Sequence, residues 1–158
     1  MPAYIDSSVF LAILNGEEPV ASDIQALFAE LKRKKVTIYT SIITIQEVSV
    51  AGYTKSREPS GAAASEVSKI ARIEGITRSI SLEAAEIEAK VISKMKSREE
   101  KSQDNKRRKW DCFHIATAVH LKCSVLYSCD QGMLNRKAHL QLGDIEFSRP
   151  CTSNGTLF

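Results

Sequence analysis

The side chains in this sequence that could take part in catalysis are four acidic residues. They are Asp6, Glu47, Asp111 and Asp130. Two ionised carboxylates about 5 Å apart repel each other by roughly 3 kcal/mol at an effective dielectric of about 20, so four brought together would raise one another's pKa values. A hard divalent cation such as Mg²⁺ or Mn²⁺ removes this conflict and can activate water for phosphodiester hydrolysis. These acids are therefore the candidate catalytic and metal-binding residues, provided that the fold gathers them.

The elements that must position these acids alternate between strands and helices. Apolar and β-branched runs predict strands at residues 2–5, 36–40, 76–80, 124–128 and 145–147. Helical spacing and capping residues predict helices at residues 9–14, 19–35, 42–51, 63–73, 82–95 and 109–122. In the fifth of these helices, the spacing predicts a buried stripe of Leu82, Ala85, Ala89, Ile92 and Met95. The alternation predicts an α/β three-layer sandwich with a central, mostly parallel sheet of four to five strands. We expect one domain over residues 1–148 and a C-terminal tail at 149–158.

Three of the acids fall near one edge of such a sheet. Asp6 ends the first predicted strand, and Asp130 lies two residues past the fourth. Asp111 is in the first turn of the predicted helix that leads into the fourth strand, where an acid could equally be a simple helix cap. Because ligands of open α/β sheets bind beyond the carboxyl ends of the strands, we expect the three side chains to lie close together.

Glu47 lies in a predicted helix, residues 42–51, that is apolar on nearly every side and should be largely buried. A buried carboxylate needs a cation, a hydrogen-bond donor or a proton. No Lys or Arg lies between Val36 and Tyr53 to serve it locally. A distant basic residue or a position at the helix edge would satisfy Glu47 without any metal.

Length and composition limit the classes of protein. The 158 residues are 43% hydrophobic, enough for one buried core, and no run of about 18 apolar residues suggests a membrane span. The N-terminus lacks the features of a signal peptide, which predicts a cytoplasmic protein. The four scattered cysteines predict reduced thiols, and His114 and His120 are six residues apart, a poor spacing for metal binding on a helix.

The basic residues gather in one segment. The formal net charge is +3, yet residues 94–109 hold eight Lys and Arg side chains against three acidic ones, a local charge of +5. Such a patch on a near-neutral body suits a polyanionic partner. A solvated loop would carry the same charge without any partner.

Four short motifs contain the candidate acids. They are Tyr4-Ile5-Asp6-Ser7-Ser8, Thr44-Ile45-Gln46-Glu47-Val48, Trp110-Asp111-Cys112-Phe113-His114-Ile115-Ala116-Thr117-Ala118 and Leu126-Tyr127-Ser128-Cys129-Asp130. In this order and in these predicted contexts, they resemble the motifs of PIN-domain nucleases over residues 2 to about 147. Short domains of this kind are similar to VapC-type toxins of toxin–antitoxin pairs.

The resemblance implies a metal-dependent endoribonuclease in which the four acids hold one or two Mg²⁺ or Mn²⁺ ions. A metal-bound water would attack the scissile phosphate and leave a 5′-phosphate and a 3′-hydroxyl. Ser7 and Ser128 match small polar positions near the metal-site acids, although plain capping or turn roles suit them as well.

The resemblance also suggests macromolecular partners. Arg107, Arg108 and Lys109 lie next to Asp111, so we expect them to hold the RNA backbone by sequence-independent phosphate contacts. A cognate antitoxin and a homodimer are family expectations.

Two other classes of protein remain open at this stage. The chain could be a PIN-like fold that only binds RNA or acts as a scaffold, with the acids as remnants. A receiver-like phosphate-handling domain would use an acidic strand end, but a second acid beside Asp6 is missing. No P-loop, dinucleotide-binding or nucleophile-elbow motif is present in the sequence, which disfavours an NTPase, a dinucleotide oxidoreductase and a serine hydrolase of the usual build.

Overall fold

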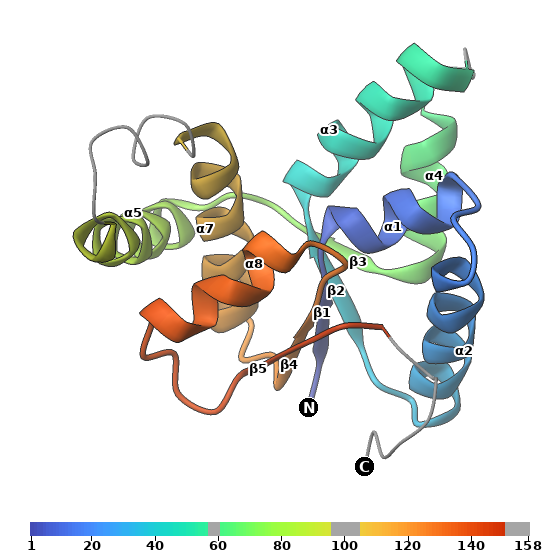
Figure 1. Cartoon of the computed structure of the whole chain (residues 1–158). Helices are drawn as coiled ribbons and strands as arrows, with labels where there is room; N and C mark the ends of the chain where they lie inside the picture. The colour runs from blue at the N-terminus through green and yellow to red at the C-terminus, as the bar shows by residue number, and fades with distance from the viewer. Residues whose placement is uncertain (57–60, 96–104, 151–158) are drawn as a thin grey trace.

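A five-stranded parallel sheet forms the centre of the computed structural model, which describes residues 1–56, 61–95 and 105–150 (Figure 1). The strands are β1 (Ala3–Ile5), β2 (Ile38–Ser41), β3 (Arg72–Glu74), β4 (Val125–Tyr127) and β5 (Glu146–Ser148). Their order is β3-β2-β1-β4-β5, and every neighbouring pair is parallel. Tyr4 pairs with Tyr39 on one side and with Leu126 on the other, so β1 lies in the middle. The predicted parallel sheet is confirmed.

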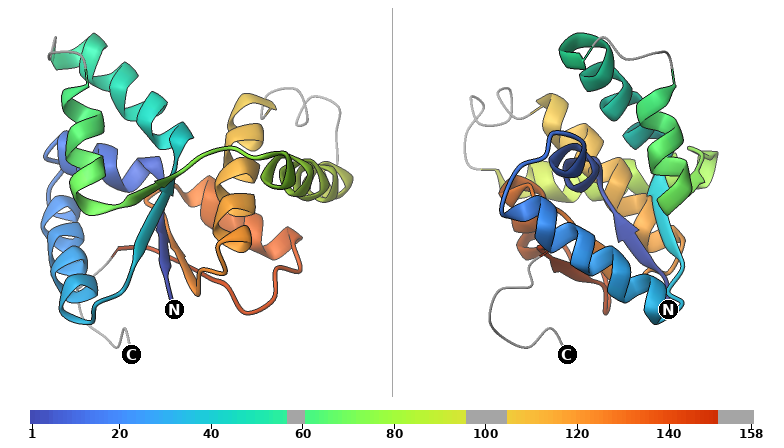
Figure 2. Two further views of the ribbon diagram at one scale, coloured as in Figure 1. Left: turned by 180° about the vertical axis from the view of Figure 1, so that it is seen from behind. Right: turned by 90° about the vertical axis from the view of Figure 1, so that its right-hand side faces the viewer.

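Helices cover both faces of this sheet, as the two further views also show (Figure 2). One layer holds α1 (Ser7–Leu14), α2 (Val20–Arg33), α3 (Ile42–Ala51), the π-helical η1 (Gly52–Ser56) and α4 (Ala62–Ile70). The other layer holds α5 (Arg78–Lys94), α7 (Asn105–His120), α8 (Gln131–Arg136) and the 3-10 helix η2 (Lys137–His139). The α/β three-layer sandwich is therefore confirmed.

The central strand contributes to two separate cores, because successive side chains of a strand point to opposite faces. Ala3 and Ile5 belong to the core on the side of α1 to α4. Tyr4 belongs to the core on the side of α5 and α7. The carboxyl end of β1 thus lies between the two helical layers, and Asp6 follows it directly.

The third strand lies earlier than the sequence predicts. Residues 76–80 do not form a strand, because Thr77 caps α5 by accepting a hydrogen bond from the Ile80 N–H at 3.2 Å. The strand is Arg72–Glu74 at the edge of the sheet, where β3 pairs with β2. The early start of α5 also changes the buried stripe, which is Ile80, Ala84, Ile87 and Val91. The predicted stripe is wrong, and its first residue, Leu82, is 57% exposed.

Asp111 does not start a helix. The helix that contains it begins at Asn105, so Asp111 lies in the interior of α7 and cannot cap its N-terminus. Asp6 and Asp130, by contrast, are the N-cap residues of α1 and α8. The capping explanation therefore fails for Asp111 and applies to the other two aspartates. The short helix α8 follows Asp130 directly.

The remaining expectations concern cysteines, membranes and the basic segment. Cys112 and Cys123 are buried free thiols, Cys129 is a partly buried one, and Cys151 lies outside the described residues. Among the helices of the described residues, none combines the length and the hydropathy of a membrane span. Residues 96–104 of the basic segment and 151–158 of the predicted tail also lie outside the described residues.

Candidate functional site

The structure brings the four predicted acids to the carboxyl end of the sheet, where α1, α3 and α8 begin (Figure 1). Asp6 directly follows β1, and Asp130 comes three residues after β4. Glu47 lies in α3, the helix that follows β2, and Asp111 lies in α7. The site therefore takes one side chain from each of four segments that are far apart in the sequence.

Asp6 is buried and held by hydroxyl and backbone donors. Its Oδ1 accepts hydrogen bonds from the Ser8 N–H at 3.0 Å and from the Ser8 hydroxyl at 2.5 Å. Burial raises the pKa of Asp6 above its ordinary value, although His114, Ser128 and Ser8 act in the opposite direction. An ionised Asp6 is thus a desolvated anion whose charge is only partly offset.

Two serine hydroxyls connect Asp6 to the loop that carries Asp130. The Ser8 Oγ lies 3.3 Å from the Ser128 Oγ and accepts a hydrogen bond from the Cys129 N–H at 2.8 Å. The Ser128 Oγ in turn accepts one from the Asp130 N–H at 3.0 Å. The end of β4 is therefore fastened to the start of α1, which fixes the spacing of the two aspartates. Ser128 was a predicted site residue, and Ser8 was not.

Glu47 is only partly buried, at 28% side-chain exposure, so the expectation of a largely buried carboxylate is wrong. Its partner is His114 of α7, whose Nε2 lies 3.3 Å from the Glu47 Oε2. Burial acts to raise the pKa of Glu47, but hydrogen bonding and charge from His114 and a hydrogen bond from Ser7 outweigh it, and the pKa lies below its ordinary value. Ser7, a predicted site residue, thus acts on Glu47.

His114 is also tied to the central strand. Its Nδ1 lies 2.6 Å from the Tyr4 hydroxyl, and both side chains are buried. When its ring is protonated, His114 also lowers the pKa values of Asp6 and Asp111. His114 therefore lies among three of the four acids.

Asp111 pairs with an arginine from α8. The Arg136 Nε lies 3.0 Å from the Asp111 Oδ2, and the two side chains are 10% and 9% exposed. Burial raises the pKa of Asp111 to about 6, because Arg136 lowers it less than burial and the nearby Asp130 raise it. The pair joins α7 to α8 and brings Asp111 into electrostatic reach of Asp130.

The three basic residues predicted to hold RNA differ in position. Arg107 and Lys109 are exposed, and the Arg107 Nε lies 3.9 Å from the Asp130 Oδ2. Arg108 is 5% exposed and pairs with Glu88 at 3.2 Å, so its role is to hold α7 against α5. Arg108 is therefore not available to a phosphate group, which corrects that part of the expectation.

The donor chemistry of the acids fits a hard divalent cation. Asp6 and Asp111 are buried carboxylates with raised pKa values, the condition that a bound cation relieves. Glu47 and Asp130 add oxygen donors that are partly open to solvent. Within the described ranges, however, no three His, Cys, Asp or Glu side chains are already arranged around one ion position. The residues thus match the ion in type, and their side chains would have to turn to share it.

Sequence reasoning missed Tyr4, Ser8, His114 and Arg136. For two of them, spacing from the acids gave a signal. His114 follows Asp111 by three residues, which places both on one helix face. Tyr4 precedes Asp6 by two, the period of a strand.

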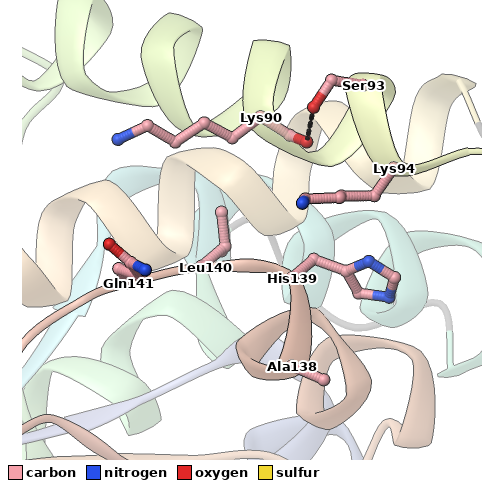
Figure 3. A pocket seen from close by; sticks show the side chains of 7 residues that line it. All are labelled: Lys90, Ser93, Lys94, Ala138, His139, Leu140 and Gln141. Carbon is pink, nitrogen blue, oxygen red and sulfur yellow. Dashed lines mark hydrogen bonds between the residues drawn. The ribbon is translucent and has the colours of Figure 1, made fainter.

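One cavity lies elsewhere, between α5 and η2, with a volume of about 280 Å³ (Figure 3). Its lining includes Lys94 and His139 and none of the four acids. Because the chemistry-bearing carboxylates are absent from it, we do not assign the active site there.

Comparisons with known proteins agree with this architecture. A family model described as PIN domain matches residues 3–140. A search of curated proteins finds no match.

Several solved structures share the fold. VapBC2 from Rickettsia felis, bound to a promoter DNA fragment, aligns with a TM-score of 0.68 and 12% identity over 94% of this chain and 98% of that chain. VapBC-1 from nontypeable Haemophilus influenzae aligns with a TM-score of 0.61 and 12% identity, over 95% of this chain and 98% of that chain. VapC20 of Mycobacterium tuberculosis is a toxin that cleaves the sarcin-ricin loop. It aligns with a TM-score of 0.58 and 17% identity, over 83% of this chain and 92% of that chain.

Proposed function

The chain belongs to the PIN-domain family, and from this premise we propose that it is a metal-dependent endoribonuclease of the VapC toxin type. One observation carries the proposal. Four carboxylates from different elements lie near the carboxyl end of the sheet, and two of them are buried with raised pKa values. Such a group of anions suits a divalent cation and a phosphodiester substrate.

In this proposal, Asp6, Glu47, Asp111 and Asp130 hold Mg²⁺ or Mn²⁺. When bound, the ion polarises a phosphoryl oxygen and lowers the pKa of a coordinated water. Ser8 and Ser128 keep Asp6 and Asp130 at a fixed spacing through their hydrogen bonds.

The Arg136 side chain has a separate part in this proposal. Its Nε lies 3.0 Å from the Asp111 Oδ2, so a bound ion would share the Asp111 carboxylate with this guanidinium group.

The RNA would approach over the exposed basic side chains beside the acids. Arg107 and Lys109 are both exposed, and Arg107 reaches Asp130. Their contacts with phosphate groups would position the backbone without reading its sequence.

We further propose a cognate antitoxin and a homodimer. Structures of VapBC and FitAB complexes are among the neighbours of this fold, and FitAB aligns with a TM-score of 0.63 at 16% identity. An acidic site of this kind could receive a basic segment of an antitoxin, because complementary charge favours such an insertion.

The deciding experiment is cleavage of total RNA and tRNA by the purified protein with Mg²⁺ or Mn²⁺. We expect metal-dependent fragments that EDTA abolishes and that Asp111→Asn does not produce. Asp144→Asn is the matched control, because Asp144 is an exposed acid outside the site. RNA cleavage by a clean Asp111→Asn preparation would refute the proposal.

A second candidate function is an RNA-binding or scaffolding domain without catalysis. Two features favour it: Asp111 already has a cationic partner in Arg136, and no ion position is preformed in the described part of the chain. RNA binding without turnover, unchanged by divalent metal, would establish this alternative.

A further inference from the structure

Three side chains from different elements form a buried hydrogen-bonded series at the edge of the candidate site. The Tyr4 hydroxyl on β1 lies 2.6 Å from the Nδ1 of His114 on α7, and the Nε2 of the same ring lies 3.3 Å from the Oε2 of Glu47 on α3. Tyr4 is fully buried, and the His114 side chain is 3% exposed. The series therefore runs from the core to a carboxylate that is open to solvent.

The chemistry of the three groups fixes the direction of these hydrogen bonds. An ionised carboxylate can only accept, so the proton between His114 and Glu47 must lie on Nε2. In a neutral imidazole, Nδ1 is then the acceptor, and the Tyr4 hydroxyl donates to it. Burial, aided by the charge of Asp6, raises the pKa of Tyr4 well above its ordinary value, so this hydroxyl keeps its proton at neutral pH.

The polar groups around this hydrogen-bonded series already have hydrogen-bond partners. Thr40 donates its hydroxyl to the Ile5 carbonyl at 2.7 Å and lies 2.7 Å from the Thr44 hydroxyl. Both ring nitrogens of His114 also have partners. His114 is thus placed to support a carboxylate, and a direct bond to a metal would break one of its hydrogen bonds.

We propose that His114 is a positioning residue that holds the Glu47 carboxylate toward the other acids, with Tyr4 fixing the ring tautomer that makes this possible. The inference rests on the proposed function, since it assigns Glu47 to divalent cation binding. Glu47 lies on a partly exposed helix, and its flexible side chain could turn to solvent without this hydrogen bond. Partners of this kind typically change metal affinity by about 10- to 100-fold.

The test is Mn²⁺ binding to the full-length, RNA-free protein, measured by calorimetry and by the EPR signal of free Mn²⁺. We expect His114→Leu to weaken binding by about 10- to 100-fold. His114→Gln, whose amide N–H can replace the Nε2–H, should lie within a few-fold of the wild type. His120→Leu is the matched control, because His120 is exposed on the same helix.

Two further measurements keep the outcome clear if His114→Leu does not fold. Tyr4→Phe removes the donor to Nδ1 and should weaken Mn²⁺ binding less than His114→Leu does. The ring ¹⁵N shifts of the wild-type protein should show a proton on Nε2 of His114. In the unmodified protein, a His114 ring without a proton on Nε2 would overturn the inference.

The results also separate this inference from the proposed function. If His114→Leu and His114→Gln both bind Mn²⁺ as tightly as the wild type does, the positioning role is wrong and the nuclease proposal stands. If the wild type neither binds Mn²⁺ nor cleaves RNA, the proposed function fails and the positioning role fails with it. An unchanged KM for RNA in His114→Leu would support a role confined to the metal site, and a raised KM would contradict it.

Discussion

Asp6 and Glu47 come from the side of the sheet covered by α1 and α3, whereas Asp111 and Asp130 come from the side of α7 and α8. On the first side, the donors to the carboxylates are serine groups and an imidazole. On the second side, the partners of Asp111 and Asp130 include arginines, at 3.0 Å and 3.9 Å. One half of the site therefore has arginines built into the chain, and the other half has hydrogen-bond donors from serine and histidine.

This difference suggests how an acidic site can fold before a cation arrives. Burying an ionised carboxylate is costly unless it is paired, and Arg136 supplies that pairing for Asp111. Asp6 accepts hydrogen bonds from Ser8 instead of pairing with an arginine, and burial raises its pKa. A divalent cation would thus be attracted first by the half without arginines and would compete with Arg136 in the other half.

The largest effect should come from removing a carboxylate from the half without arginines. We expect Asp6→Asn to lower metal-dependent RNA cleavage by more than about 100-fold, beyond the range of outer partners of a metal site. Asparagine can still cap α1, so the fold should persist. Asp130→Asn, which removes a more exposed acid paired with Arg107, should cost less activity. A smaller loss for Asp6→Asn than for Asp130→Asn in single-turnover assays would contradict the comparison.

Breaking the built-in pairing should affect stability most. Arg136→Met leaves the buried Asp111 without its counter-charge, and we expect the free energy of unfolding to fall by about 3 to 5 kcal/mol at pH 7. Added Mg²⁺ should recover part of this loss, because the ion can replace the lost charge. Urea unfolding with and without Mg²⁺ measures both effects.

Arg107→Met is the matched control for this experiment. Arg107 is 66% exposed and lies 3.9 Å from Asp130, so its removal should change stability by less than about 1 kcal/mol. If Arg136→Met and Arg107→Met lower the free energy of unfolding equally, burial does not increase the contribution of the Arg136–Asp111 pair to stability.

The pH dependence of stability should reveal the same buried carboxylate. The pKa of Asp111 is about 6 in the folded protein and near its ordinary value of 3.8 in the unfolded chain. The folded state therefore binds more protons between these values, and the free energy of unfolding falls as the pH rises through this window. Two pKa units correspond to about 3 kcal/mol at most. Urea unfolding of the metal-free protein from pH 4 to pH 7 should show this fall.

Asp111→Asn should flatten this profile, since it removes one of the groups with a raised pKa. Asp6, whose pKa is also raised, should keep a residual slope of the same sign. An unchanged slope in Asp111→Asn would mean that other groups dominate the pH dependence.

The sequence predicted the sheet well because its strands are short apolar runs with helices between them. It also pointed to the acids, since Asp6 follows β1 directly and Asp130 comes three residues after β4. It failed at the third strand, where Ile76 and Ile80 are four apart and fit a helix as well as a strand. Arg72–Glu74 carries two charges in three residues and pairs only as an edge strand, so its pattern gave no signal.

The partners of the acids could not be predicted in the same way. Arg136 meets Asp111 across 25 residues, and His114 meets Glu47 across 67. Such contacts depend on how α7 packs against α8 and β2, which no local pattern records. The same limit applies to Arg108. In the sequence it is another basic residue beside Arg107 and Lys109, but in the fold it pairs with Glu88.

The smallest expected effect concerns the exposed basic side chains at the half of the site that has arginines. Replacing Arg107 and Lys109 together by Gln should weaken RNA binding and reduce the salt slope of the affinity by about 1.4, at about 0.7 for each single-strand phosphate contact. Lys32→Gln with Lys69→Gln is the charge-matched control on exposed residues of α2 and α4, and it should leave the slope unchanged. Binding of a short RNA by Asp111→Asn protein at several salt concentrations measures this effect without cleavage. Equal slopes for the two double variants would show that RNA does not approach over the side of α7 and α8, and the arginines there would then serve only to balance the charge of the acids.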